Sequence, residues 1–76
     1  IRFVLDSPVA ITPRLVVYDL AGRRVKMLTD GRALQGRQEI RWDGRDGRGT
    51  SVATGMYFAR LTGAGAARVL RVPLVR

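Results

Sequence analysis

Residues 41–61 read RWDGRDGRGTSVATGMYFARL, and the glycines and aspartates in the middle of this stretch decide how the chain folds. Glycine enters turns because it adopts positive φ readily, and aspartate enters them because its carboxylate bonds to the nearby backbone. Trp42 ends one alternating segment before this stretch, and an aromatic segment follows it. The stretch therefore predicts a corner between two β-strands, shaped by Asp43, Gly44, Gly49 and Gly55.

Two ligand-binding interpretations of the same stretch are disfavoured by its own residues. In a calcium loop that begins at Asp43, Arg48 would occupy the glycine position and Arg45 a ligand position. The spacing from Gly44 to Gly49 matches a phosphate-binding loop, but Thr50 replaces the lysine and a strand-like segment follows. We expect no metal, no cofactor and no catalytic residue in this protein.

Hydrophobic residues recur elsewhere with a period of two, which is typical of half-buried strands. Pro73 cannot donate to a ladder, so the last strand is expected at a sheet edge, and Leu28 breaks the parity of its segment, which indicates a bulge. The pattern predicts strands at 1–5, 15–18, 25–28, 37–42, 56–61 and 67–72.

Turn signals separate these segments at short intervals, and no window has the period and caps of a helix. Several short strands punctuated in this way predict an all-β sandwich or a small barrel. The signals lie at Ser7-Pro8, Thr12-Pro13, Ala21-Gly22, Asp30-Gly31, Gln35-Gly36 and Gly63-Ala64-Gly65.

Trp42 and Tyr57 could form an exposed pair that stacks on sugars or bases, or they could belong to the core. Both fall on the strand face that also carries Ile40, Ala59 and Leu61. Because apolar parity decides which face of a strand is buried, we expect both rings in the core.

The composition narrows the possible functions. The chain of 76 residues has neither cysteine nor histidine. The commonest general base, the commonest metal ligand and any thiolate are therefore missing. We therefore expect a protein that is not an enzyme.

No apolar run approaches the ~20 residues that span a bilayer. The chain is short enough for one module, residues 1–76, which we expect to be the C-terminal part of a longer protein.

The net charge of +8 is carried almost entirely by arginine. Strand parity places Arg2, Arg37, Arg41, Arg60 and Arg71 toward solvent, and others fall in turns. This predicts a dispersed basic coat, which disfavours nucleic acid and favours acidic protein surfaces or anionic envelope polymers as partners. The candidate docking residues are Arg45, Arg48, Arg71 and Arg76.

Three motifs resemble one known family. VYDLAGRRV at 17–25, WDGRD at 42–46 and GMYFARL at 55–61 are similar to the immunoglobulin-like domain of the flagellar hook-capping protein. They are equally similar to the C-terminal sorting domains of the type IX secretion system. The resemblance implies an immunoglobulin-like β-sandwich of about seven short antiparallel strands without an active site. It also implies turn and core roles for Tyr18, Asp19, Gly22, Trp42, Asp43, Gly44, Gly49, Gly55 and Tyr57.

The expected function is a non-catalytic C-terminal sorting, anchoring or docking module of a secreted or cell-surface bacterial protein. Its partners would be its parent polypeptide and the export machinery, contacted through arginine-bearing loops and free strand edges. One alternative is a structural or accessory subunit of an envelope or extracellular assembly, at the cell surface or in the periplasm. A third possibility is binding of carbohydrate or anions through the loops.

Overall fold

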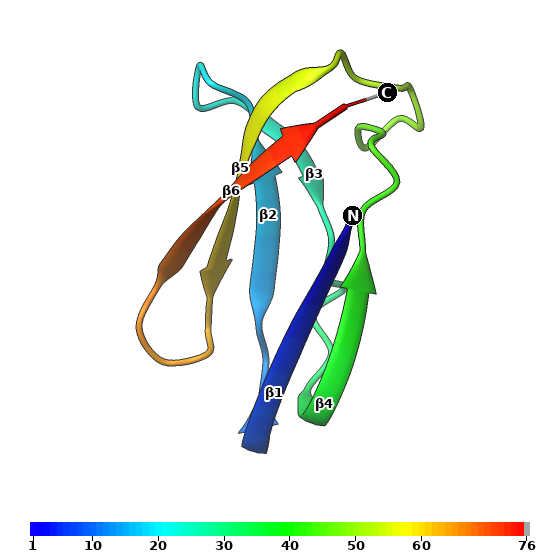
Figure 1. The fold of residues 1–76 in the computed structure, drawn as a ribbon. Coiled ribbons are helices and arrows are strands. Elements are labelled where there is room, and N and C mark those ends of the chain that lie inside the picture. Colours follow the sequence, from blue (N-terminus) through cyan, green and yellow to red (C-terminus); the bar gives the residue numbers. More distant parts are fainter. Residues whose placement is uncertain (76) are drawn as a thin grey trace.

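The computed structural model describes residues 1–75, which form six β-strands in two antiparallel sheets. One sheet pairs β1 with β4, and the other has the order β3-β2-β5-β6 (Figure 1). The strands are β1 (Arg2–Ile11), β2 (Arg14–Tyr18), β3 (Arg24–Met27), β4 (Leu34–Arg41), β5 (Gly55–Thr62) and β6 (Arg68–Leu74). This confirms the all-β, immunoglobulin-like sandwich, with six strands where about seven were expected. Within residues 1–75 there is no helix long and apolar enough to cross a membrane.

The core lies between the two sheets and is centred on Trp42, of which only 1% is exposed. Its ring packs edge-on against Tyr57, with centroids 5.3 Å apart and planes inclined by 70°. Both rings are buried, as strand parity predicts. The buried cluster comprises Leu15, Val17, Trp42, Tyr57, Ala59, Val72 and Leu74.

The first strand is longer than expected, and the turn predicted at Ser7-Pro8 is wrong. β1 runs through both residues, and only the register of its pairing with β4 shifts, between Ser7 and Ile11. Proline removes one backbone donor without reversing the chain, so it is accommodated where the ladder is already irregular. The turn predicted at Gln35-Gly36 is also wrong, because both residues lie within β4.

The bulge in the third strand occurs at Val25 and not at Leu28. On β2, Val17 lies opposite Lys26 and Tyr18 lies opposite Arg24, so Val25 is the extra residue. Leu28 continues the pairing with β2, since its N–H donates to the carbonyl of Leu15 at 2.8 Å, and its side chain packs against the core. Because of this extra residue, Val25 and Leu28 pack against the core, whereas Met27 lies opposite Val16 on the other face.

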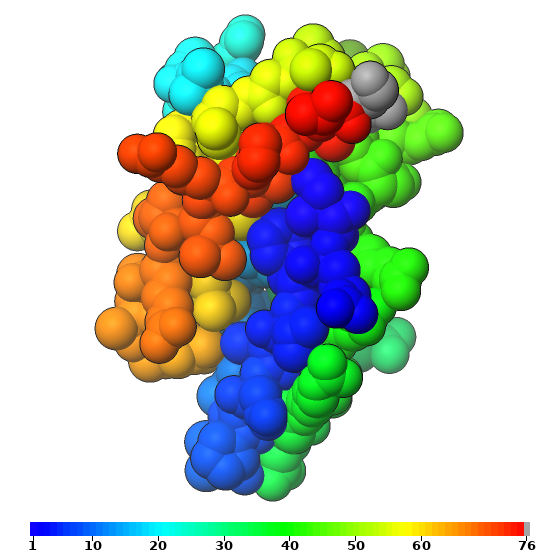
Figure 2. All heavy atoms as spheres, viewed as in Figure 1, coloured from blue at the N-terminus to red at the C-terminus, as the bar shows by residue number. Residues whose placement is uncertain are grey.

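β6 forms an edge of the larger sheet, as Pro73 predicts, and Pro73 lies opposite Met56 of β5. Within the described residues, β1 and β6 each have a strand partner on one side only. A groove of about 580 Å³ separates β1 from the β5–β6 hairpin, and Leu5, Leu61 and Leu70 contribute to its lining (Figure 2).

Candidate docking site

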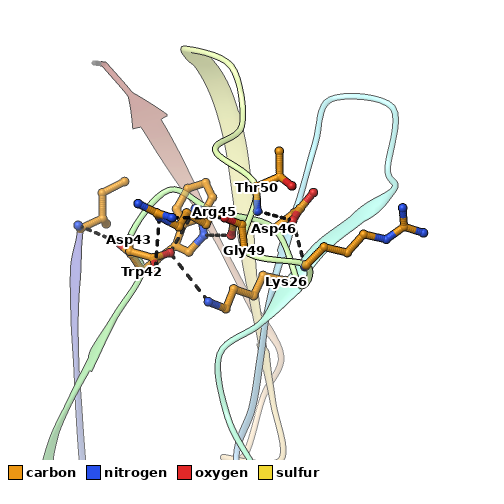
Figure 3. Close-up of polar contacts among 9 residues, drawn as sticks. Lys26, Trp42, Asp43, Arg45, Asp46, Gly49 and Thr50 are labelled. Carbon is orange, nitrogen blue, oxygen red and sulfur yellow. Dashed lines mark hydrogen bonds and ion pairs between the residues drawn. The ribbon is translucent and has the colours of Figure 1, made fainter.

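The loop from 42 to 54, which links β4 to β5, is shaped by its own aspartates (Figure 3). The Asp43 carboxylate accepts the N–H of Arg45 at 3.1 Å. The Asp46 carboxylate accepts two N–H groups, from Arg48 at 2.9 Å and from Thr50 at 3.0 Å. These are the aspartate-to-backbone bonds that stabilise tight turns. Both carboxylates thus point at the chain itself.

Glycines complete the turns of this loop. Gly44 has φ +74° and Gly49 has φ +82°, a region in which a side chain is strained. The N–H of Gly49 donates to the carbonyl of Asp46 at 3.0 Å. The N–H of Gly47 donates to the carbonyl of Val25 at 3.1 Å, so the loop also covers part of the outer edge of β3.

Trp42 joins the loop to the core. Its indole N–H donates to the carbonyl of Arg45 at 2.9 Å, which satisfies the only polar atom of the buried ring. Its backbone exchanges hydrogen bonds with Ile1, from the Trp42 N–H at 2.9 Å and from the terminal ammonium at 3.0 Å. Nearby, the hydroxyl of Tyr57 donates to the carbonyl of Ala53 at 2.6 Å.

The turn between β2 and β3 repeats the same chemistry with one aspartate. Asp19 accepts the N–H groups of Ala21 and Arg23, both at 2.9 Å, and the guanidinium of Arg23 at 3.0 Å. The backbone N–H of Arg23, followed by the charge of its side chain, holds the pKa of Asp19 below its ordinary value. This turn begins directly after the half-buried Tyr18. Gly22 closes it with φ +81°.

The glycines after the loop differ in what they require. Gly55 opens β5, and a Cβ there would meet no atom, so its place in the motif has no steric cause. Gly63, which the motifs do not include, has φ +78°, and a Cβ on it would collide with the carbonyl oxygen of Thr12. The Gly63-Ala64-Gly65 signal in the sequence indicated a turn but not this close approach.

Of the four arginines expected to form a docking surface, the three that the structure describes come from two different elements. Arg45 donates to the carbonyl of Gly49 at 3.3 Å within its own loop, and Arg48 is exposed in the same loop. Arg71 lies on β6, opposite Phe58. Arg76 lies outside the described residues.

A different set of arginines shares one surface, the face of the four-stranded sheet that points away from the core. Val16 lies opposite Met27 and Arg60, and Arg60 lies opposite Val69. Residues in such register project from the same face. We call this surface the outer sheet face, and its residues are Arg14, Val16, Tyr18, Arg24, Met27, Met56, Phe58, Arg60, Thr62, Val69, Arg71 and Pro73.

Strand parity correctly predicted that Arg60 and Arg71 are exposed, but it did not predict that three arginines share this face. Arg14, Arg60 and Arg71 come from three strands and lie on the same face as two aromatic residues, Tyr18 and Phe58. Parity indicated that such arginines point to solvent, but it carried no information on which strands are neighbours. A hollow of about 230 Å³ on this face is lined by Arg14, Val16, Tyr18, Arg60 and Thr62.

Comparison with known proteins gives one family. A family model described as the FlgD Ig-like domain matches residues 1–66. No curated protein and no solved structure gives a significant match.

Proposed function

The chain belongs to the FlgD Ig-like domain family, and from that premise we propose that it is a non-catalytic docking module of a secreted or cell-surface bacterial protein. It would act through protein–protein contacts that sort or anchor its parent polypeptide. The observation that carries the proposal is the family match over residues 1–66. Within this range Trp42 and Tyr57 lie in the core, and Asp19 and Asp43 shape turns.

The use of the polar side chains supports this proposal. Asp19, Asp43 and Asp46 accept hydrogen bonds from their own loops. Carboxylates engaged in this way shape the backbone and are poorly placed to transfer protons. The arginines of the outer sheet face and the free edges of β1 and β6 then remain as groups for binding another protein.

Sorting is tested by fusing residues 1–76 to a secreted reporter in a bacterium that has type IX export. We expect the reporter to be delivered to the cell surface, and a fusion that carries Trp42→Ala to lose delivery because its sandwich is destabilised. Delivery equal to that of the unfused reporter would contradict a sorting role.

The family match also favours a second candidate, a structural or accessory subunit related to the flagellar hook cap. This function requires self-association or stable incorporation into an assembly. Sedimentation velocity at increasing protein concentration measures self-association, and a strict monomer that joins no hook-type assembly would contradict this candidate.

A further inference from the structure

The outer sheet face differs in chemistry from the outer face of the small sheet. On β1 and β4, Arg2 and Arg41 form ion pairs with Glu39, at 3.7 and 2.7 Å. Asp6 of β1 lies opposite Arg37 of β4, so that face mixes both signs of charge.

On the outer sheet face, no aspartate or glutamate among residues 1–75 occupies a register position. Arg14, Arg60 and Arg71 are exposed there, and none of them forms an ion pair within the described part of the chain. Asp46 lies near this face only at its β3 edge, beside Arg24 and Met27. The part of the face on β2, β5 and β6 is thus positively charged without an ion-pair partner, which attracts an anionic partner.

Two of these arginines flank the hollow on the same face. Arg14 lies opposite Thr62, and Arg60 lies opposite Val16, which makes the two arginines diagonal neighbours on β2 and β5. Val16 also lines the hollow, but it is only 2% exposed, so the side chains around it supply most of the accessible surface. A carboxylate placed here could accept hydrogen bonds from both guanidinium groups, while the rest of its side chain contacts Tyr18.

The remaining side chains on this face are those of a protein-binding surface. Met27, Met56 and Val69 are 39%, 36% and 62% exposed, and they lie on the same face as the half-buried Tyr18 and Phe58. Aromatic residues, methionine and arginine are enriched in protein interfaces, whereas lysine, aspartate and glutamate are depleted there. Single-stranded nucleic acid instead needs exposed ring faces for stacking, and here both rings are partly covered.

We propose that the outer sheet face is the docking surface of the module and that it binds an acidic segment of a partner protein. A partner carboxylate sits between Arg14 and Arg60, and apolar partner residues contact Met56 and Val69. This inference rests on the proposed docking function and names the surface and the partner chemistry for it.

The test uses ¹⁵N-labelled residues 1–76 and a blocked octapeptide of alternating glutamate and valine at low ionic strength. We expect peptide-induced amide shifts centred on β2, β5 and β6, with binding that weakens as salt is added. A peptide with glutamine in place of glutamate should bind at least about tenfold more weakly, since the charge-assisted hydrogen bonds are lost.

Two double variants change the net charge equally. Arg14→Gln with Arg60→Gln should reduce affinity at least about tenfold, whereas Arg37→Gln with Arg41→Gln, on the small sheet, should leave it within about twofold. If the double variant Arg14→Gln with Arg60→Gln disturbs folding, Arg71→Gln serves as a third variant. It should also bind the acidic peptide more weakly than the wild type does.

Three results of the peptide experiment would overturn this inference. They are shifts confined to another surface such as the loop from 42 to 54, absence of peptide binding, and binding of an octathymidylate at least as tight as that of the acidic peptide. The reporter fusion distinguishes a wrong choice of surface from a wrong docking function. Surface delivery that survives Arg14→Gln with Arg60→Gln would leave the docking function intact and refute only the choice of face.

Discussion

At the scale of single residues, the sandwich depends most on Trp42. It is the largest of the fully buried side chains, it contacts the ring of Tyr57, and its indole N–H holds the loop through the carbonyl of Arg45. One residue therefore supports both the core and the position of the loop.

We predict that Trp42→Ala lowers the free energy of unfolding by about 3–5 kcal/mol, because it removes a buried aromatic ring and leaves a cavity. A domain of this size has little stability to spare, so the variant should be largely unfolded at room temperature. Urea denaturation followed by circular dichroism measures the change. Val4→Ala, at an exposed position of β1, is the control and should change stability by less than about 1 kcal/mol.

Gly63→Ala should destabilise the protein by more than about 1–2 kcal/mol, since a left-handed conformation is combined with a collision against the Thr12 carbonyl. Gly55→Ala is the matched control, because its Cβ would lie in open space at an ordinary φ, and it should be nearly neutral. Thermal denaturation measures the melting temperatures of the two variants, and that of Gly63→Ala should be the lower. Equal melting temperatures would show that the strand connection at Gly63 adjusts without cost.

Asp19 predicts a dependence of stability on pH. Its pKa in the folded protein is lowered from 3.8, so its stabilising contribution is fully present above that value and is lost as the pH falls through the folded pKa. The difference in unfolding free energy between the wild type and Asp19→Asn should be largest near neutral pH and should shrink in acid. A difference that does not change with pH would mean that the Arg23 side chain and backbone do not stabilise the charged carboxylate.

At the scale of elements, the loop from 42 to 54 behaves as an extension of the larger sheet. An isolated bridge joins Arg45 to Ser51, and the bond from Gly47 to Val25 attaches the loop to β3. The bulge at Val25 twists β3 at the same place, as bulges do at sheet edges. The loop therefore covers part of one edge that would otherwise expose unpaired backbone groups.

We predict that Asp46→Ala loosens this loop without unfolding the sandwich. The N–H groups of Arg48 and Thr50 lose their acceptor, so their amide hydrogen exchange should accelerate together with that of Gly47, while exchange in β5 stays slow. Asp46→Asn keeps an acceptor oxygen and should restore most of the protection. Uniform acceleration across β5 would instead place the loop within the cooperative core.

At the scale of the whole molecule, the charge is unbalanced. The net charge is +8, and the arginines of the outer sheet face form no ion pair with any residue in the range 1–75. Mutual repulsion of these groups opposes the compact state, and salt screens it over a Debye length of about 10 Å at about 0.1 M.

The melting temperature should accordingly rise when sodium chloride is increased from about 0.02 M to about 0.5 M. The rise should be smaller for the variant with Arg14→Gln and Arg60→Gln, which has lost two of the repelling charges. Calorimetry at both salt concentrations makes the comparison. A melting temperature that falls with salt would indicate that the surface ion pairs stabilise the protein more than the repulsion destabilises it.

Much of this protein follows from short-range sequence alone. The period of two in 37–42 and 56–61 predicts strands and buries Trp42, and Pro73 predicts the edge position of β6, because both are consequences of local backbone geometry. The turn chemistry of Asp43 and Asp46 is equally local, since each carboxylate bonds to residues within four positions.

Only the tertiary structure decided which strands are neighbours, and with that which charges meet. Arg14 is far from Arg60 and Arg71 in the sequence, and the three share one face because β2, β5 and β6 pair side by side in one register. The bulge at Val25 likewise arises from pairing with another strand. The requirement for glycine at position 63 arises from the nearby carbonyl of Thr12. Strand parity assigns each side chain to one of two faces, whereas the order and register of strands depend on how the whole core packs.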